Sequence, residues 1–179
     1  MKHHILFIDT SKGSDDFALF KKKLSEFVSD LKKTNPTDLL TLVTLGPKYC
    51  IQTMNQSLND FDCSSILKLE QHCNLCLFDI LAPAMKKVIS FHNISELKTN
   101  EINALIFVRG TLEESVIVTE ETLLLQFMYA FQKKWKIFFM SESNELSLLF
   151  KKLSCTESFV YKIEENCLNA FFSDLKTLL

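Results

Sequence analysis

The chain has 179 residues, of which 47% are hydrophobic and 23% charged, with a net charge of −2. A chain of this length buries about 70% of its unfolded surface in one core, so we expect a single domain over residues 1–179. The sequence carries no basic surface for nucleic acid, no run of the roughly 18 apolar residues that span a membrane, and no signal-peptide pattern. We therefore expect an intracellular protein that binds neither nucleic acid nor membrane directly.

The first segment of the chain predicts a strand and then an amphipathic helix. Ile5 to Ile8 form a short apolar run of the kind found in buried strands. Asp15 and Asp16 favour a helix start, and Asn35-Pro36 ends the pattern. The expected buried face of this helix consists of apolar side chains at helical spacing: Phe17, Phe20, Leu24, Phe27, Val28 and Leu31.

The next segment predicts a β-hairpin followed by two helices. Leu39 to Leu45 and Tyr49 to Met54 form two strands with a turn at Gly46-Pro47, close enough to pair antiparallel. Ser64 to Gln71 predict a short helix. A longer helix with Pro83 in or near its first turn, where proline is tolerated, presents Ile80, Leu81, Ala84, Met85, Val88 and Ile89.

Strands and helices then alternate to the end of the chain, with a polar surface loop at His92 to Glu101. The expected strands are Ile102 to Val108, Ile137 to Met140 and Phe159 to Ile163. The expected helices run from Thr119 to Lys134, with Leu124, Phe127, Met128 and Phe131 on one face, and around Leu146 to Leu153 and Leu168 to Leu175. Six strands alternating with helices favour a three-layer α/β fold, mostly parallel, with one antiparallel hairpin edge strand and helices on both faces.

Glycine and cysteine usage argues against common catalytic and cofactor sites. Only three glycines occur, too few for a phosphate-binding loop. Cys73 and Cys76 form a single C-x-x-C, which is half of a zinc site, and no spacing joins a cysteine to a histidine for catalysis. We expect no enzyme activity, no cofactor and no disulfides, with free thiols that act as small core residues: Cys50, Cys63, Cys73, Cys76, Cys155 and Cys167.

The loop after the first strand carries the most informative motif. Asp9-Thr10-Ser11-Lys12-Gly13 resembles the Asp-x-Ser-x-Ser metal-site motif of von Willebrand factor A (vWA) domains. The resemblance implies a vWA/Rossmann-like sheet with Mg²⁺ held by oxygen ligands from three loops. Asp9 and Ser11 match the motif, whereas Gly13, Leu77 and Arg109 stand where the family has oxygen ligands. We therefore expect a degenerate site that holds no metal.

Arg109 is the only arginine in the chain and directly follows the strand Ile102 to Val108. Neighbouring parallel strands end at the same edge of a sheet, so we expect this residue beside Asp9. A guanidinium there would supply the charge that Mg²⁺ supplies in a working site, because arginine stays protonated and binds carboxylates. Asp9 and Arg109 are thus a candidate structural or interface pair. The alternative is an ordinary surface arginine at a strand end.

Within the vWA superfamily, the chain most resembles the smaller vWA subunit of the TFIIH core. Three segments carry the likeness: Leu6 to Thr10, Ile80 to Met85 and Phe131 to Ile137. The resemblance implies a non-enzymatic scaffold in transcription initiation and nucleotide excision repair, located in the nucleus. The implied partners are other protein subunits, such as a zinc module or a second vWA subunit.

Other vWA proteins remain as alternatives. Asn35-Pro36 followed by Leu42 to Leu45 resembles the second-strand entry of the vWA subunit of the proteasome regulatory particle. The larger vWA subunit of TFIIH is a third protein that the chain resembles to a similar degree. All three relatives are non-catalytic docking subunits, so the resemblance implies that role for this chain. A different class is a metal-dependent ligand-binding vWA domain, which needs a working site at Asp9 and Ser11.

Overall fold

A computed structural model describes residues 1–11, 17–72, 76–94, 101–109, 119–153 and 157–179. Within these residues the strands are β1 (Lys2–Asp9), β2 (Leu39–Leu45), β3 (Tyr49–Ser57), β4 (Glu101–Val108), β5 (Trp135–Ser141) and β6 (Glu157–Val160). The helices are α1 (Phe17–Thr34), α2 (Ser64–Leu67), α3 (Leu77–Ile94), α4 (Glu120–Gln132), α5 (Asn144–Lys152) and α6 (Glu165–Leu178), with a short 3-10 turn at Leu58–Asp60.

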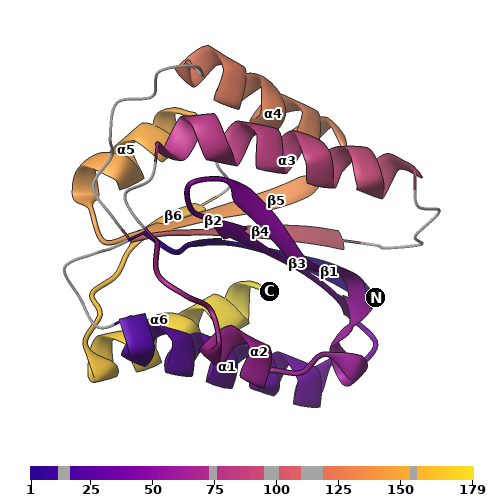
Figure 1. The fold of residues 1–179 in the computed structure, drawn as a ribbon, viewed down its shortest axis with the longest axis vertical. Helices are drawn as coiled ribbons and strands as arrows, with labels where there is room; N and C mark the ends of the chain where they lie inside the picture. Colours follow the sequence, from indigo (N-terminus) through magenta and orange to yellow (C-terminus); the bar gives the residue numbers. More distant parts are fainter. Residues whose placement is uncertain (12–16, 73–75, 95–100, 110–118, 154–156) are drawn as a thin grey trace.

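The six strands form one sheet in the order β3-β2-β1-β4-β5-β6, in which β3 pairs antiparallel with β2 and the other pairs are parallel. Helices α1, α2 and α6 cover one face, and α3, α4 and α5 cover the other (Figure 1). The strands at the centre are apolar on both faces, as strands covered on both sides must be. The predicted three-layer α/β fold with an antiparallel edge hairpin is confirmed.

Each face of the sheet has its own apolar core. The core beneath α1 and α6 is rich in aromatic rings. The ring centres of Phe27 in α1 and Phe172 in α6 are 5.1 Å apart. The opposite core contains Phe139 and Phe150, whose rings stack at 3.4 Å. All six apolar positions expected on the inner face of α1 are buried. The helical spacing of those residues was therefore sufficient to place this helix.

Some predicted boundaries were wrong for local reasons. Pro83 is the seventh residue of α3, because the helix already starts at Leu77 and continues to Ile94; the helix gives up one backbone hydrogen bond there. The predicted helix Ser64 to Gln71 shortens to Ser64–Leu67, and β6 ends at Val160 rather than at Ile163. The expected loop from His92 to Glu101 is helical at its start and part of β4 at its end, with residues 95–100 outside the described chain.

Two expectations about burial were also wrong. On α4, Phe127 is buried and Leu124 and Phe131 pack partly buried against the core as expected, but Met128 is 50% exposed, and Leu123 and Ala130 are buried instead. The sequence of this helix is apolar on every side, so periodicity alone could not choose the inner face. The described cysteines are free but none lies in the core: Cys50 is exposed, and Cys63, Cys76 and Cys167 are partly exposed. Across the part of the chain that the structure describes, no helix is both long and apolar enough to span a bilayer.

Candidate functional site

The carboxyl ends of β1, β4 and β5 bring three charged residues to one edge of the sheet. β1 ends at Asp9, and Arg109 directly follows β4, its neighbour in the sheet. Glu142 directly follows β5, which pairs with the other side of β4. These parallel strands run in register, so the residues that leave their ends are adjacent although they are far apart in sequence.

Asp9 is fully buried, and its carboxylate is bound by backbone donors. Oδ1 accepts the Ser11 N–H at 2.7 Å, and Oδ2 accepts the Arg109 N–H at 2.9 Å. A buried carboxylate needs such donors because it has lost its hydration, and hydrogen bonds to an ionised acceptor are strong. Asp9 thereby ties the loop after β1 to the end of β4.

The Arg109 side chain is buried between an acidic residue and two aromatic rings. Its Nε lies 3.6 Å from Oε1 of Glu142, with side-chain exposures of 0% and 15%. The guanidinium carbon lies 4.5 Å from the ring centre of Phe17 and 5.7 Å from that of Phe20, within cation–π range. The arginine therefore links β4, β5 and α1, which rules out an ordinary surface arginine.

The predicted proximity of Asp9 and Arg109 is present, but the backbone of Arg109 makes the contact. Any residue other than proline could donate that N–H. The recorded ion pair of the guanidinium is with Glu142, which the sequence analysis did not single out. The sequence does contain one indication of Glu142: it directly follows β5, a strand of the same sheet. The prediction that the Arg109 guanidinium takes the place of Mg²⁺ at Asp9 is therefore revised. The guanidinium forms an ion pair with Glu142, and Asp9 is bound by the backbone N–H of Arg109.

The described residues do not fit a Mg²⁺ site, which needs six oxygen ligands in octahedral geometry. Both oxygens of Asp9 accept N–H groups, and Leu77 contributes a buried apolar side chain at the start of α3. The buried Ser11 hydroxyl, which has no hydrogen-bond partner among the described residues, is the one remaining oxygen of the motif there. Gly13 lies outside the described residues. Nor does the described part of the chain contain a cluster of three or more His, Cys, Asp or Glu suited to a metal.

His72 closes the same edge through backbone contacts. Its N–H donates to the Thr10 carbonyl at 2.8 Å, and Ser11 and His72 form an isolated parallel bridge. A Cβ at Gly46 would lie 3.1 Å from Cδ2 of His72 and 3.2 Å from Oγ1 of Thr10, so glycine allows these loops to approach. His72 is thus held as part of the edge. Cys73, which begins the C-x-x-C, lies outside the described residues.

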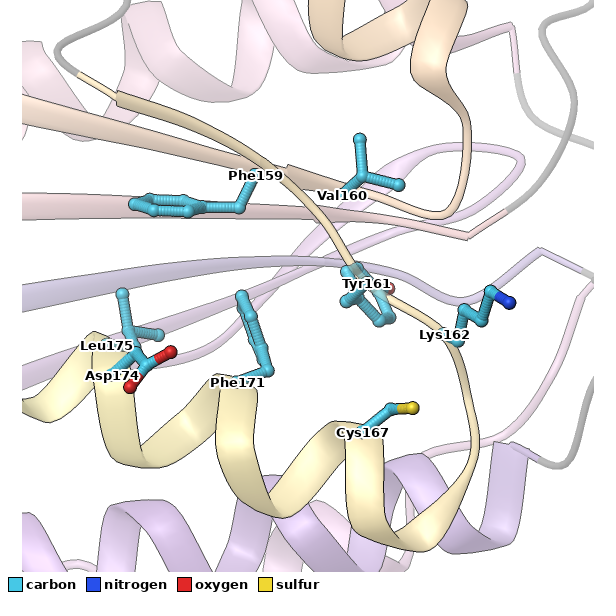
Figure 2. Close-up of a pocket in the computed structure, with 8 residues that line it drawn as sticks. All are labelled: Phe159, Val160, Tyr161, Lys162, Cys167, Phe171, Asp174 and Leu175. Carbon is cyan, nitrogen blue, oxygen red and sulfur yellow. The ribbon is translucent and has the colours of Figure 1, made fainter.

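A groove of about 330 Å³ lies beside β6 and α6, away from this edge (Figure 2). Aromatic rings form its floor. The ring centre of Phe171 lies 5.2 Å from that of Tyr161 and 6.4 Å from that of Phe159. Lys162 lies at one end of the groove and Asp174 at the other. The sequence alone does not indicate this groove, because its residues come from a strand and a helix whose relative placement depends on the fold.

β6 is the last strand of the sheet, so one of its edges is open. The Tyr161 N–H donates to the Ser141 carbonyl at 3.0 Å. Because the backbone N–H and C=O groups of alternate residues point to the same side of a strand, those of Phe159 and Tyr161 face β5. The backbone groups of Ser158 and Val160 therefore point to the open edge. The Val160 side chain is 45% exposed. An open strand edge beside an apolar groove is the arrangement to which extended peptides add.

Buried histidines lie at the opposite end of the strands. His3 Nε2 is 2.9 Å from Oγ1 of Thr41, and the His3 ring stacks on His92 at 5.5 Å. Burial, with smaller effects from His92 and His4, lowers the pKa of His3 to about 3. Burial also lowers the pKa of His4, although its bond to Asp38 opposes the shift. These rings are neutral structural groups of β1.

Comparison with known proteins supports the fold. No family model and no curated protein matches the sequence at a significant level. The solved structure of the SpRpn10 VWA domain matches with a TM-score of 0.68 and 15% identity, covering 99% of this chain and 95% of that chain. The D319A mutant of the PilB minor pilin from Streptococcus sanguinis matches with a TM-score of 0.68 and 13% identity, covering 99% of this chain and 61% of that chain. At these identities the similarity shows the fold, a vWA/Rossmann-like α/β sheet.

The ion pair at the strand ends can be tested by double-mutant cycles. Arg109→Ala removes the guanidinium but keeps the N–H that binds Asp9. We expect it to cost about 2–4 kcal/mol of unfolding free energy, because Glu142 loses its counter-charge in a partly buried position. The coupling with Glu142→Gln should be about 1–2 kcal/mol, and that with Asp9→Asn below about 0.5 kcal/mol. Urea unfolding measures both, and a larger coupling with Asp9 would contradict the assignment.

The histidines predict a pH dependence of stability. Because the pKa of His3 is about 3 when folded and about 6.5 when unfolded, only the unfolded chain binds this proton between those values. Stability is therefore complete above pH 6.5 and falls as the pH decreases, with His3 alone removing about 2 kcal/mol at pH 5. Urea midpoints between about pH 7.5 and pH 5 measure the slope. His3→Gln should flatten it, and an unchanged slope in that variant would contradict the role of His3.

Proposed function

We propose that this chain is a non-enzymatic domain of the vWA type that docks other protein subunits in an intracellular assembly. One observation carries the proposal: the position of the family's metal site is filled by the chain's own groups. The Asp9 carboxylate is bound by the N–H groups of Ser11 and Arg109, and the Arg109 side chain is buried against Glu142. A strand-end edge closed in this way offers no coordination position to an acidic ligand.

The groove beside β6 is the surface that we assign to a partner subunit. An extended apolar segment would pair with the open edge of β6 and place alternate side chains on the aromatic floor. Lys162 and Asp174 at the two ends of the groove favour a segment with opposite charges at its own ends. The backbone pairing would provide affinity, and the floor and charges would provide selectivity.

Among assemblies, the TFIIH core comes first and rests on the sequence resemblance alone, which also motivates a nuclear location. In the structure, the segment Phe131 to Ile137 is the turn from the end of α4 into β5. The proteasome regulatory particle is the second candidate, and the fold similarity to the SpRpn10 VWA domain is consistent with it.

Quantitative capture with the tagged full chain tests the function and the surface together. Wild type should retain TFIIH helicase and transcription-factor subunits, and Val160→Lys should lose them, because a lysine on an edge strand opposes the addition of another strand. Leu67→Lys is the matched control: Leu67 is 47% exposed and Val160 is 45% exposed, but Leu67 lies on α2 away from the groove. This control should retain the partners.

Other outcomes are decisive as well. Proteasome lid subunits in the wild-type sample would transfer the assignment to the proteasome, and subunits of neither assembly would contradict both candidates.

Titration calorimetry with Mg²⁺ and Mn²⁺ separates the docking domain from a metal-dependent ligand binder. We expect no binding in the micromolar range. Micromolar binding that disappears in Asp9→Asn would overturn the non-metal interpretation.

A further inference from the structure

The open edge of β6 determines where an added strand can form hydrogen bonds. Phe159 and Tyr161 direct their backbone groups to β5, so the N–H and C=O groups of Ser158 and Val160 are the ones that face outwards. Unpaired groups of this kind are a template for another strand. A segment that docks beside β6 therefore bonds at Ser158 and Val160, two positions apart.

The side chains of β6 show which residues of such a segment would enter the groove. Phe159 and Tyr161 contact Phe171 on the α6 side of the sheet, whereas the Ser158 hydroxyl lies 2.6 Å from that of Ser147 on the α5 side. Side chains alternate between the faces along a strand, and directly opposed residues of neighbouring strands share a face. Residues opposite Phe159 and Tyr161 would therefore cover the aromatic floor, and the residue between them would face α5.

The charges of the groove have opposite sign at its two ends. Lys162 lies just past the carboxyl end of β6, and Asp174 lies towards the amino end of the strand (Figure 2). Both side chains are exposed. Of the acidic residues that follow Lys162, Glu165 pairs with Lys23, and Glu164 does not line the groove. The groove thus offers a positive charge at one end and a negative charge at the other.

We propose that the docked segment is an antiparallel strand of a partner protein with the order acidic, apolar, any, apolar, any, basic from its amino end. This inference rests on the proposed docking role of the groove and specifies the chemistry of the segment. Antiparallel pairing is slightly more stable per residue than parallel pairing, which favours it on a strand of four residues. In this direction the acidic residue lies beside Lys162, and the basic residue lies beside Glu157 and Asp174. The two apolar residues lie opposite Tyr161 and Phe159, over the floor.

The chain's own β6 does not have this order in any antiparallel register that joins the outward-facing groups. When Ser158 pairs with Val160 of a second copy, Glu157 of that copy lies opposite Tyr161, where an apolar residue is required. The two other registers place Glu157 opposite Phe159, over the floor, or leave both end positions without a charge. The complementary segment therefore belongs to a partner rather than to a second copy.

Fluorescence anisotropy of dye-labelled peptides, titrated with the full chain at low ionic strength, tests the order of the segment. The peptide Asp-Val-Thr-Val-Thr-Lys, with blocked ends, should bind. The reversed peptide Lys-Thr-Val-Thr-Val-Asp should bind on the order of tenfold more weakly, because each charge then meets one of like sign. Lys162→Glu combined with Asp174→Lys should shift the preference towards the reversed peptide, which loss of folding could not do. Equal affinities in wild type, or a preference that the double variant leaves unchanged, would overturn the inference.

N-methylation of single peptide residues tests the direction and register. A methyl group on the residue opposite Val160 or Ser158 replaces an N–H that bonds to β6, so it should abolish binding. A methyl group on the residue opposite Phe159 should be tolerated, because that N–H points away. The inverse pattern would show a parallel strand and contradict the inference.

Controls separate this inference from the proposed function. Val160→Lys should bind neither peptide, and Leu67→Lys should bind them like wild type. If no peptide binds but Val160→Lys still loses the captured subunits, the order of the segment is wrong and the docking site stands. If Val160→Lys keeps the captured subunits, the docking site itself is contradicted, and this inference fails with it.

Discussion

The buried carboxylate of Asp9 is the constraint on which the strand-end edge depends. An ionised group without water is tolerated only where donors replace its hydration, and here two backbone N–H groups do so. One donor belongs to the chain just after β1, and the other holds the end of β4 beside it. This fixed backbone directs Arg109 towards Glu142 and the rings at the start of α1. The carboxylate that begins the segment resembling a vWA metal-site motif thus serves here as an internal link between the two strand ends.

Closing that edge changes where the domain can meet other molecules. The described strand ends are engaged with one another, whereas exposed apolar side chains lie on other parts of the fold, among them β6 and α4. The groove beside β6 suits an extended segment because it combines unpaired backbone with an aromatic floor.

Sequence reasoning was most successful where local patterns and the fold agree. The apolar runs of the central strands and the spacing of the α1 residues leave one arrangement each, and the structure has both where the sequence predicts them. It misplaced Met128 on α4, where apolar residues surround the helix and only the neighbouring elements decide which side is buried. It also placed Pro83 too early, because the helix begins three residues before the first clear periodic position, Ile80.

The candidate site was predictable in part. The motif and the strand order indicated that Asp9 and Arg109 would be adjacent, because parallel strands end together. The atoms that meet could not be predicted, since a backbone N–H leaves no signal in the identity of its residue. Glu142 lies 133 and 33 positions along the chain from Asp9 and Arg109, respectively, and only the sheet brings it to them. The groove beside β6 likewise arises from packing rather than from a motif.

Amide hydrogen exchange of Arg109 and Ser11, followed by NMR, tests most directly whether Asp9 is this internal link. If both N–H groups donate to the carboxylate, both exchange slowly, and Asp9→Ala accelerates them while the amides within β4 stay protected. Addition of Mg²⁺ should leave the wild-type rates unchanged. Rapid exchange of the Arg109 amide in the wild-type chain, or rates that respond to Mg²⁺, would show that the carboxylate is available to a metal and would contradict the closed edge.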